Sequence, residues 1–471
     1  MSSAAGADLH LIDALDGAGR YRTNRREVVR DVTGTPVAEL TLAPALYIAR
    51  TMDKLRSAPA TAAAWPAELR AERLRSAARR FAGGVLDGIA PDEHHRLVAR
   101  TTGVPVAVAR AAAATIADVA AHAQDCVELA RPAGAVPSGA RAGEKGPAGP
   151  VVVWRRRGRV FSVQASGNHP AVHSLWLESL ALGYRVAVRP SRRDPFTAYR
   201  LVLALRAAGF PDDDVLLLPC DHATAGELVH GGDLAMVFGG DEVLARYGAS
   251  GNRTPILPQG PGRVKVLITG DWEPHLEVVA ESVAGLGGVS CLNTTAVLVE
   301  HDAPGFARAL AERLAQAKPL PPEDEAAELP CTSLAEARAL DAFLRASATG
   351  ATPVLGGEGI AHDLGDGSAA LRPAVHLLAD TGSGHLDIEL PFPCAWVAPW
   401  SASLGVAPLR NSLVVGLAAE SDALVDDLVA DPSVRNIYGL DRPTWWLPPG
   451  VPHDGFLAEF LMRSTAVARS R

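Results

Sequence analysis

The alternation of apolar strands and short helices between residues 159 and 269 constrains the fold of this chain more than any other feature. Strands are predicted at 159–163, 185–189, 214–218, 234–238 and 264–269. Helices are predicted between them at 171–182, 196–208, 223–229 and 241–248. Apolar strands separated by helices of about ten residues are typical of parallel strands joined by crossover helices. We therefore predict an α/β fold built on a parallel sheet.

Three polar segments follow strands of this predicted sheet. Ligands of parallel α/β sheets bind beyond the carboxyl ends of the strands, so these segments are candidate binding loops. They are residues 164–170 (Gln-Ala-Ser-Gly-Asn-His-Pro), 189–195 (Arg-Pro-Ser-Arg-Arg-Asp-Pro) and 239–241 (Gly-Gly-Asp). None of them contains the spacing G-x-G-x-x-G, so an ordinary dinucleotide fingerprint is absent.

A second candidate site surrounds Cys291, which lies in a glycine-containing turn between a predicted helix and a predicted strand. Residues 276–283 have apolar side chains at helical spacing, and residues 296–300 predict a buried strand. Gly287 and Gly288 interrupt the helical pattern just before the cysteine. A turn of this kind can expose a sulfur nucleophile in a cleft, whereas most free cysteines are small core residues. The segment alone leaves both interpretations open.

Composition limits the classes of protein that the chain can belong to. Its 471 residues are 48% hydrophobic, which is enough for a large core in two or three domains. A formal charge of -8, with no basic block longer than residues 155–157, argues against nucleic acid as a partner. The five cysteines are scattered, and no C-x-x-C or H-E-x-x-H spacing occurs, so we predict neither a disulfide framework nor a metal site.

The sequence also bears on membranes and localisation. No run of about 18 apolar residues occurs, because Arg110 and Asp118 interrupt the Ala-rich stretch 106–121. The first eight residues have neither the basic start nor the apolar core of a signal peptide. We therefore expect a soluble, cytoplasmic protein without a membrane partner.

Elements outside the parallel sheet are less regular. Residues 26–40 predict two short strands around a turn at 33–36. Further helices are predicted at 43–57, 66–88, 91–101, 105–130, 304–317 and 334–347. The Gly-, Pro- and Ala-rich segment 132–150 predicts either a linker or, together with the strand-like residues that follow, a projecting hairpin. The tail 435–471 is aromatic enough to pack against another surface, with Trp445, Trp446, Phe456 and Phe460.

The order of several short motifs resembles the aldehyde dehydrogenase superfamily from about residue 26 to the end. The motifs are Thr-Gly-Val-Pro (102–105), Gly-Asn-His-Pro (167–170), Arg-Pro-Ser (189–191), Gly-Phe-Pro (209–211), Phe-Gly-Gly (238–240), Gly-Val-Ser-Cys (288–291), Glu389 near Phe392, and Asn436. The resemblance implies a Rossmann-like cofactor domain (1–131 and 158–258) and an α/β catalytic domain with the cysteine (259–440). It also implies a small oligomerisation domain made of a hairpin (132–157) and the tail (441–471).

The resemblance assigns roles to individual residues. Cys291 resembles the nucleophile that attacks the carbonyl carbon, and Asn168 resembles the donor that stabilises the oxyanion together with the backbone N–H of Cys291. Glu389 resembles the carboxylate on the nicotinamide ribose, Phe392 the aromatic residue beside it, and Arg189 stands where a lysine usually binds the adenosine ribose. The other implied cofactor-binding residues are Gln164, Ala165, Ser166, Ser191, Arg192, Gly239, Gly240 and Asp241.

Three departures from the family pattern bear on the reaction. The Glu-Leu-Gly-Gly motif that supplies the general base in hydrolytic members corresponds to residues 257–262, where neutral Gln259 cannot usefully accept a proton near pH 7. The segments 166–168, 189–195 and 238–241 resemble the fatty acyl-CoA reductases of bacterial luminescence, whereas Gly-Val-Ser-Cys is the ordinary dehydrogenase pattern. Asp241 begins a helix that would face the cofactor pyrophosphate, so either the cofactor sits differently or Asp241 turns away.

These observations predict an NAD(P)-dependent oxidoreductase that interconverts an aldehyde and an acyl thioester through an acyl-Cys291 intermediate, with coenzyme A or a carrier thiol as co-substrate. One alternative is a conventional aldehyde dehydrogenase that forms a carboxylic acid, in which His169 or Glu281 activates water. His169 can equally pack in the core or cap the helix that follows it. Another alternative is a non-catalytic subunit that binds a nucleotide or a partner, although the joint presence of Cys291 and Asn168 argues against it.

Cofactor choice is predicted from the basic residues after the second strand. NAD-preferring relatives often carry a glutamate three positions after the ribose-binding lysine, and Arg192 stands there with Arg193 beside it. Guanidinium groups at this position would bind a 2′-phosphate unless they are solvated or paired with Asp194. We therefore expect NADP(H) to be preferred, with NAD(H) as the second choice, and we expect a homodimer or a homotetramer.

Overall fold

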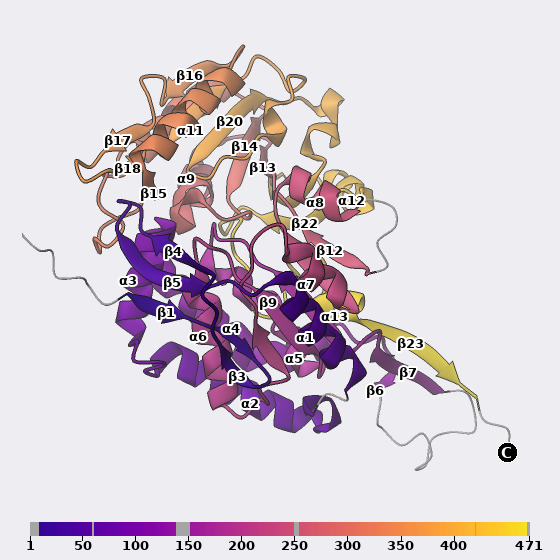
Figure 1. Ribbon diagram of the computed structural model, residues 1–471. Coiled ribbons are helices and arrows are strands. Elements are labelled where there is room, and N and C mark those ends of the chain that lie inside the picture. Colours follow the sequence, from indigo (N-terminus) through magenta and orange to yellow (C-terminus); the bar gives the residue numbers. More distant parts are fainter. Residues whose placement is uncertain (1–8, 59–60, 138–150, 249–253, 420, 469–471) are drawn as a thin grey trace, which may run out of the picture.

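The parallel strands predicted between residues 159 and 238 form the centre of the first of two seven-stranded sheets. The computed structural model describes residues 9–58, 61–137, 151–248, 254–419 and 421–468. In Figure 1 the first sheet lies in the lower, indigo-to-magenta half of the molecule and the second lies in the upper, orange half. The expected α/β architecture is confirmed.

The first sheet has the strand order β12-β11-β8-β9-β10-β2-β3, in which the first five strands are parallel. The strands are β2 (Ala14–Asp16), β3 (Gly19–Tyr21), β8 (Val160–Gln164), β9 (Arg185–Arg189), β10 (Val215–Leu217), β11 (Leu234–Phe238) and β12 (Ile256–Gln259). Strand β12 is not predicted from the sequence because it contains Pro258, and proline is tolerated there only because β12 is an edge strand. The predicted strand at 264–269 belongs instead to the second sheet.

Helices cover both faces of the first sheet. All residues of β9 are buried: Val186 and Val188 pack on one side under helices α2, α4 and α6, and Ala187 packs on the other under α1 and α7. Burial on both faces explains the continuous apolar runs that predicted these strands. The helices are α1 (Ala45–Ser57), α2 (Ala67–Gly83), α3 (Pro91–Thr102), α4 (Val106–Leu129), α6 (Pro195–Ala207), α7 (Ala225–Gly231) and α8 (Asp241–Gly248).

Helix α4 is, within the described residues, the one helix with the length and hydropathy of a membrane span. Its buried residues, among them Ile116 and Ala120, belong to the first core, where α4 packs against α2, α3 and α5 (Glu178–Ala181). Arg110 and Asp118 interrupt its apolar surface, as noted in the sequence. Helix α4 is therefore a packed helix in the layer that covers the first sheet.

The helix predicted at 171–182 is broken into two short pieces. Residues Pro170–Ser174 form the 3-10 helix η2, and only Glu178–Ala181 form α5. The hydroxyls of Ser174 and Ser179 donate to the carbonyls of Ala171 and Trp176, and such local side-chain bonds compete with a regular helix. The break places residues 168–178 along one wall of a cavity described below.

The second sheet has the order β16-β19-β20-β14-β13-β21-β22, with only β16 antiparallel. Its strands are β13 (Val264–Ile268), β14 (Thr294–Val299), β16 (Thr352–Leu355), β19 (Ala374–Leu377), β20 (Cys394–Pro399), β21 (Ser412–Ala418) and β22 (Val434–Gly439). One face packs against α9 (Leu276–Ala284) and α10 (Ala303–Leu314), and the other against α11 (Leu334–Ser347) and α12 (Asp422–Ala430).

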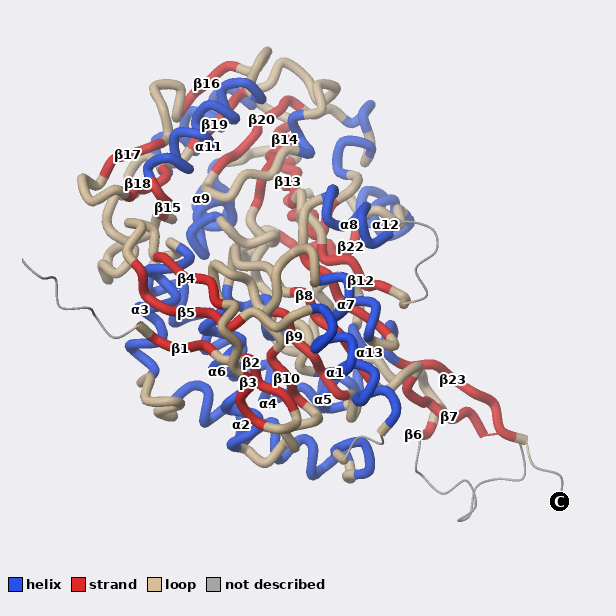
Figure 2. Tube along the Cα trace, in the orientation of Figure 1, coloured by secondary structure: helices blue, strands red, loops and turns tan. Residues whose placement is uncertain are grey.

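Three small sheets complete the fold. One contains β1 (His10–Ile12), β4 (Arg26–Arg30) and β5 (Pro36–Thr41), which include the two strands predicted around the turn at 33–36. Another contains β15 (Cys331–Ser333), β17 (Ala361–Asp363) and β18 (Ser368–Leu371). The last contains β6 (Val136–Pro137), β7 (Val151–Arg156) and β23 (Met462–Val467), which project from the body as an arm (Figures 1 and 2).

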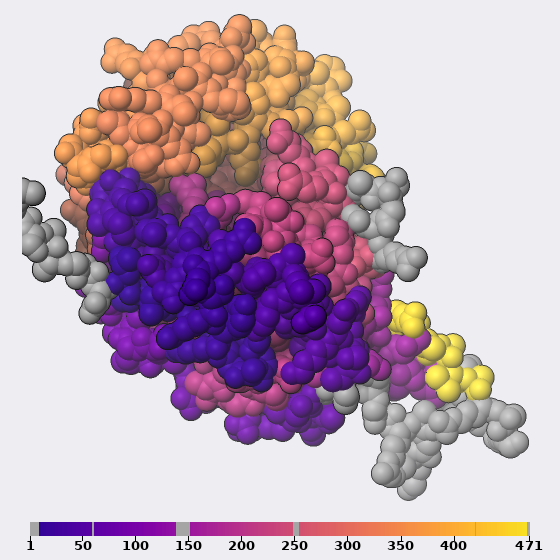
Figure 3. Space-filling view, viewed as in Figure 1, coloured from indigo at the N-terminus to yellow at the C-terminus, as the bar shows by residue number. Residues whose placement is uncertain are grey.

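The projecting arm differs from the predicted hairpin. Strands β6 and β7 pair in parallel, so they are not the two antiparallel strands of a hairpin. The antiparallel partner of β7 is β23, from the end of the chain. In the space-filling view this yellow strand lies beside the purple half, away from most of the late sequence (Figure 3). Residues 138–150 of the predicted hairpin lie outside the described residues.

The aromatic part of the tail packs mainly inside the molecule. Trp445 and Trp446 contact the cluster of Leu292 and Tyr438, beside the second sheet. Residues 445–457 then line a cavity before the short helix α13 (Leu457–Leu461) leads into β23. The oligomerisation role expected for the tail 441–471 stays a prediction, and within the chain the half-buried Trp445 and Trp446 pack beside the second sheet.

Candidate active site

Cys291 lies in the connection from α9 to β14, as the sequence predicts. The chain passes so close to the neighbouring segment here that a Cβ on Gly288 would lie 2.5 Å from the backbone nitrogen of Pro393, and the φ of Gly288 is +65°. Only glycine fits such a position without strain. The Oδ1 of Asn293 accepts a hydrogen bond from the backbone of Ser290 at 2.9 Å, which closes the turn. The turn therefore holds Cys291 in a defined position.

His453 contacts the sulfur of Cys291. Its Nε2 lies 3.4 Å from the cysteine Sγ, and its backbone carbonyl accepts a hydrogen bond from the Nδ2 of Asn436 at 2.7 Å. Its Nδ1 has no hydrogen-bond partner among the described residues. Sequence reasoning missed His453, because it lies 162 residues from Cys291 in a Pro-rich loop and no spacing rule connects the two.

Burial determines the protonation of this pair. Burial raises the pKa of Cys291 to about 12, and the nearby charge of Glu389 acts in the same direction. Burial lowers the pKa of His453 to about 4. Near pH 7 the resting pair is therefore a neutral thiol beside a neutral imidazole, which can accept the thiol proton.

Asn168 lies beside the loop that carries Cys291. Its Nδ2 donates to the backbone carbonyl of Val289, two residues before the cysteine, at 2.9 Å. Asn168 and Cys291 line the same two cavities. The predicted oxyanion donor is therefore next to the nucleophile, with its amide bonded to the cysteine loop.

The two bases suggested for the hydrolytic alternative are poorly suited to the role. The Nδ1 of His169 accepts from the backbone of Ala171 at 3.3 Å, so the capping interpretation is confirmed, and the basic nitrogen of the neutral ring is engaged there. Glu281 does not line the cavities at Cys291, and its backbone carbonyl accepts from the indole of Trp445.

Two cavities meet at Cys291. The first, which we call the apolar cavity, has a volume of about 430 Å³ and extends along α4, η2 and the loop 445–457. The second, which we call the glycine-lined cavity, has a volume of about 410 Å³ and lies at the carboxyl ends of β8 and β11. Strand order reverses between β8 and β11, and ligands bind at such switch points. The residues common to both cavities include Asn168, Val172, Gln259, Ser290, Cys291 and His453.

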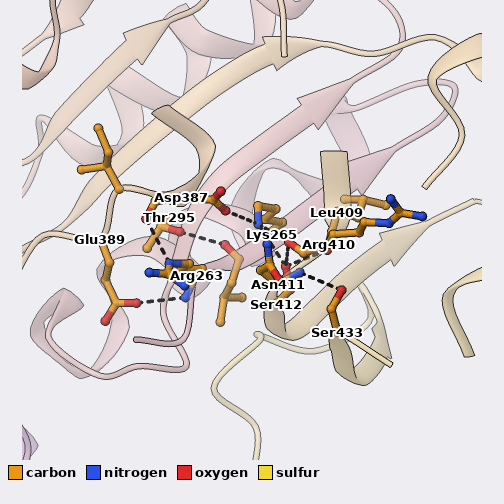
Figure 4. Close-up of polar contacts among 12 residues, drawn as sticks. Arg263, Lys265, Thr295, Asp387, Glu389, Leu409, Arg410, Asn411, Ser412 and Ser433 are labelled. Atoms are coloured by element: carbon orange, nitrogen blue, oxygen red, sulfur yellow. Dashed lines mark hydrogen bonds and ion pairs between the residues drawn. The ribbon is translucent and has the colours of Figure 1, made fainter. Parts of the chain in front are cut away.

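Glu389 faces the glycine-lined cavity and is held there by the residue that precedes β13. Its Oε2 accepts from the backbone nitrogen of Arg263 at 2.9 Å, and burial raises its pKa. The Arg263 side chain donates to the carbonyl of Asp387, while the Lys265 Nζ donates to the Oδ1 of Asp387 at 3.0 Å. Figure 4 shows this network, which fixes the segment before Glu389 against the catalytic sheet.

Asp241 also joins this network. Its Oδ2 accepts from the guanidinium of Arg263 at 2.5 Å, so the side chain turns towards Arg263 at the start of α8. Of the two outcomes expected for Asp241, the turned side chain is the one observed. The contact links the first domain to the segment that carries Glu389.

The nicotinamide end of a dinucleotide fits the glycine-lined cavity. Ser166, Gly239, Gly240, Glu389 and Phe392 line it around Cys291. A Cβ on Gly240 would meet no atom within 4 Å, so open space lies over the backbone there. A carboxylate can accept hydrogen bonds from ribose hydroxyls, and these residues would hold the nicotinamide riboside.

Gln164, Ala165 and Arg189, which were also predicted to bind the cofactor, lie elsewhere. Gln164 is buried and its Oε1 accepts from the Tyr247 hydroxyl, and the Ala165 nitrogen donates to the carbonyl of Arg189. Arg189 is buried with its Nε on the carbonyl of Cys220 at 3.1 Å. None of these three residues lines the glycine-lined cavity. Each forms a hydrogen bond to another residue around the first sheet instead.

The loop 191–194 connects to other parts of the chain. Ser191 accepts from the backbone of Arg193, and Arg192 forms an ion pair with Glu27 on β4 at 2.6 Å. Arg192 lines a third cavity of about 380 Å³, whereas Arg193 lines both that cavity and the glycine-lined one. The alternative in which Arg192 and Arg193 pair with Asp194 is wrong, because the Asp194 carboxylate caps α6.

A cysteine between an apolar cavity and a cavity at the switch point of a parallel sheet suits an oxidoreductase that binds a dinucleotide and attaches its substrate to the cysteine. The sequence profile described as "Aldehyde dehydrogenase family" matches residues 20–420. The chain belongs to the aldehyde dehydrogenase family.

Individual relatives are distant. The chain is 29% identical over 282 residues to a 2-hydroxymuconic semialdehyde dehydrogenase of Pseudomonas sp. (strain CF600), covering 56% of this chain and 57% of the relative. It is 29% identical over 163 residues to a probable methylmalonate-semialdehyde/malonate-semialdehyde dehydrogenase [acylating] of Caenorhabditis elegans, covering 32% and 30%. The chain thus spans just over half, or less, of the curated relatives that it matches. The structure of PnpE from Pseudomonas sp. WBC-3 superposes with a TM-score of 0.82 at 16% identity, covering 97% of both chains.

Proposed function

We propose that the protein is an NAD(P)-dependent oxidoreductase that interconverts an aldehyde and an acyl thioester through an acyl-Cys291 intermediate. The observation that carries this proposal is Gln259, which occupies the position of the hydrolytic base and lines both cavities at the cysteine. Its Oε1 has no hydrogen-bond partner in the described part of the chain. A neutral amide cannot activate water against the thioester, so a thiol is the expected acceptor.

The geometry supports a sequence of steps at Cys291. The Sγ attacks the carbonyl carbon while the Nε2 of His453 accepts the thiol proton. The Nδ2 of Asn168 and the Cys291 backbone N–H donate to the oxyanion, and Asn168 exchanges its bond to Val289 for this contact. A nicotinamide held by Ser166, Glu389 and Phe392 would supply the hydride acceptor or donor needed to interconvert the hemithioacetal and the thioester.

A conventional aldehyde dehydrogenase is the second candidate, and His453 is the observation that favours it. The same Nε2 that lies beside the Sγ could orient a water molecule towards the thioester once the acyl group is attached. The curated relatives include a protein named as acylating and others named without that term, so they do not decide between the two.

A comparison of turnover with and without coenzyme A tests the proposal. With NADP⁺ and an alkyl aldehyde, we expect product formation to require the thiol, and with NADPH we expect the acyl-CoA to be reduced. The variant Gln259→Glu restores a carboxylate at the base position and should release free acid without thiol, at a rate raised by about 10²–10⁴-fold over the wild type. Gln259→Asn is the matched neutral control. Thiol-independent turnover by the wild-type protein would favour the conventional dehydrogenase.

We propose further that NADP(H) is preferred over NAD(H). Arg193 lines the glycine-lined cavity, and Arg192 next to it could bind a 2′-phosphate if it exchanged Glu27 for the cofactor. Arg192→Glu should then weaken NADP(H) binding about tenfold or more, with little change for NAD(H). Glu27→Gln is the matched variant, because it frees Arg192 and should tighten NADP(H). Fluorescence titration measures both, and equal effects on the two cofactors would contradict the assignment.

We propose a homodimer or homotetramer assembled through the arm of β6, β7 and β23. Strand β23 is an edge of this sheet, and a projecting edge strand needs a partner or other protection. Light scattering at micromolar concentration should give a mass of two or four chains, and removal of residues 462–471 should lower it. A monomer would contradict the proposal.

A further inference from the structure

The apolar cavity is long. Helix α4 contributes Ala111, Thr115, Val119 and Cys126 to its wall. These residues span fifteen positions, and a helix rises 1.5 Å per residue, so the wall is about 22 Å long. The start of α4 lies near the cysteine loop, because a Cβ on Gly287 would lie 3.3 Å from Pro105. Cys126 therefore marks the end that is remote from Cys291.

The charges in this cavity have one sign. None of its described lining residues is Lys or Arg, and the carboxylates are Glu178 and Asp454. The two lining histidines, His169 and His453, have pKa values lowered by burial to about 4 and are neutral near pH 7. Asp454 is paired with Arg435 at 3.0 Å. Glu178 is thus the carboxylate in the cavity for which the described residues provide no ion pair.

Glu178 lies at the remote end. It begins α5, close enough to Cys126 for its charge to raise the cysteine pKa, which burial and this charge together bring to about 11. Its Oε2 is buried and has no hydrogen-bond partner among the described residues. Burial raises the pKa of Glu178 to about 7, and a hydrogen bond from the backbone of Ala458 only partly offsets this. A buried carboxylate without a partner destabilises the folded protein, and a ligand cation bound to it would remove that destabilisation.

We propose that Glu178 binds the cationic end of the substrate, an aldehyde or acyl group whose apolar chain follows α4 and ends in an ammonium group. The inference rests on the oxidoreductase function proposed above. The apolar wall accommodates the chain between the two polar ends, Cys291 and Glu178. Substrates that end in a carboxylate, such as semialdehydes of dicarboxylic acids, are disfavoured, because they would place two like charges together in a cavity without a basic side chain.

Three aldehydes of equal chain length test this inference: an unsubstituted alkanal, one with a terminal trimethylammonium group and one with a terminal carboxylate. We expect kcat/KM to be highest for the cationic aldehyde and lowest for the carboxylate. Glu178→Gln keeps an acceptor for the Ala458 backbone and removes the charge. It should lower kcat/KM for the cationic aldehyde about tenfold or more, leave the alkanal nearly unchanged and improve the carboxylate.

The outcomes separate the two proposals. If no aldehyde is oxidised, the proposed function fails. If all three are oxidised with equal kcat/KM, or if the order is the same in Glu178→Gln, only the role of Glu178 fails. Should Glu178→Gln not fold, inhibition of the wild-type protein by alkyl trimethylammonium and alkyl carboxylate ions of equal length gives the same comparison. Weaker inhibition by the cation than by the carboxylate overturns the inference.

Discussion

Replacement of Cys291 by alanine should abolish turnover and leave dinucleotide binding largely intact. The Sγ is the atom that bonds to the substrate carbon, and its loss should lower kcat by about 10⁴-fold or more, as removal of a nucleophile does in other enzymes. The residues that would hold the nicotinamide end, Glu389 and Gly240 among them, do not depend on that sulfur. Steady-state kinetics measures the first effect, and fluorescence titration of NADPH measures the second.

Two other cysteines provide matched controls. Cys126 lines the apolar cavity and Cys394 lines the glycine-lined cavity, but only Cys291 lines both. Burial raises the pKa of Cys126 to about 11 and that of Cys394 to about 12, and in the described part of the chain neither sulfur has a hydrogen bond to a histidine. Cys126→Ala and Cys394→Ala should therefore retain activity. Intact mass after exposure to an acyl-CoA should show one adduct, lost only in Cys291→Ala, and a folded Cys291→Ala protein as active as the wild type would remove the nucleophile assignment.

Much of the site could be predicted because local sequence determines it. Carboxyl ends of parallel strands meet at one edge of a sheet, so the segments after β8 and β11 had to lie together. Cys291 and Asn168 each stand in a short turn whose backbone depends on nearby residues, such as Gly288 and Asn293. Gln259 was identified in another way, through the resemblance to the family, as a departure from its Glu-Leu-Gly-Gly motif.

Contacts between distant segments could not be predicted in this way. His453 reaches Cys291 from 162 residues away, and Arg192 meets Glu27 across 165 residues. Neither pairing leaves a periodicity or a spacing in the sequence, because each depends on how separate domains and loops pack. The position of Trp445 could not be predicted for the same reason. An aromatic tail predicts burial, but the tertiary fold decides which surface it covers.

His453→Gln is expected to lower the rate of Cys291 acylation by about 10²–10⁴-fold, the usual contribution of a general base. The pH dependence should change with it. In the wild-type protein the imidazole, with a pKa of about 4, is neutral from about pH 5 upwards and can take the proton from a thiol whose pKa is about 12. Acylation should then be nearly constant between about pH 5 and 9.

Without that base, the reaction depends on the small thiolate fraction, which rises about tenfold per pH unit below the pKa of the thiol. The rate of His453→Gln should therefore increase steadily with pH and approach the wild-type rate only in alkaline solution. His169→Gln is the matched control, because His169 lines the same apolar cavity with a similarly lowered pKa but has no hydrogen bond to the sulfur in the structure. Rapid-mixing measurements with an acyl-CoA substrate give both profiles. Identical profiles for His453→Gln and the wild type would show that the 3.4 Å contact holds the sulfur in place without accepting its proton.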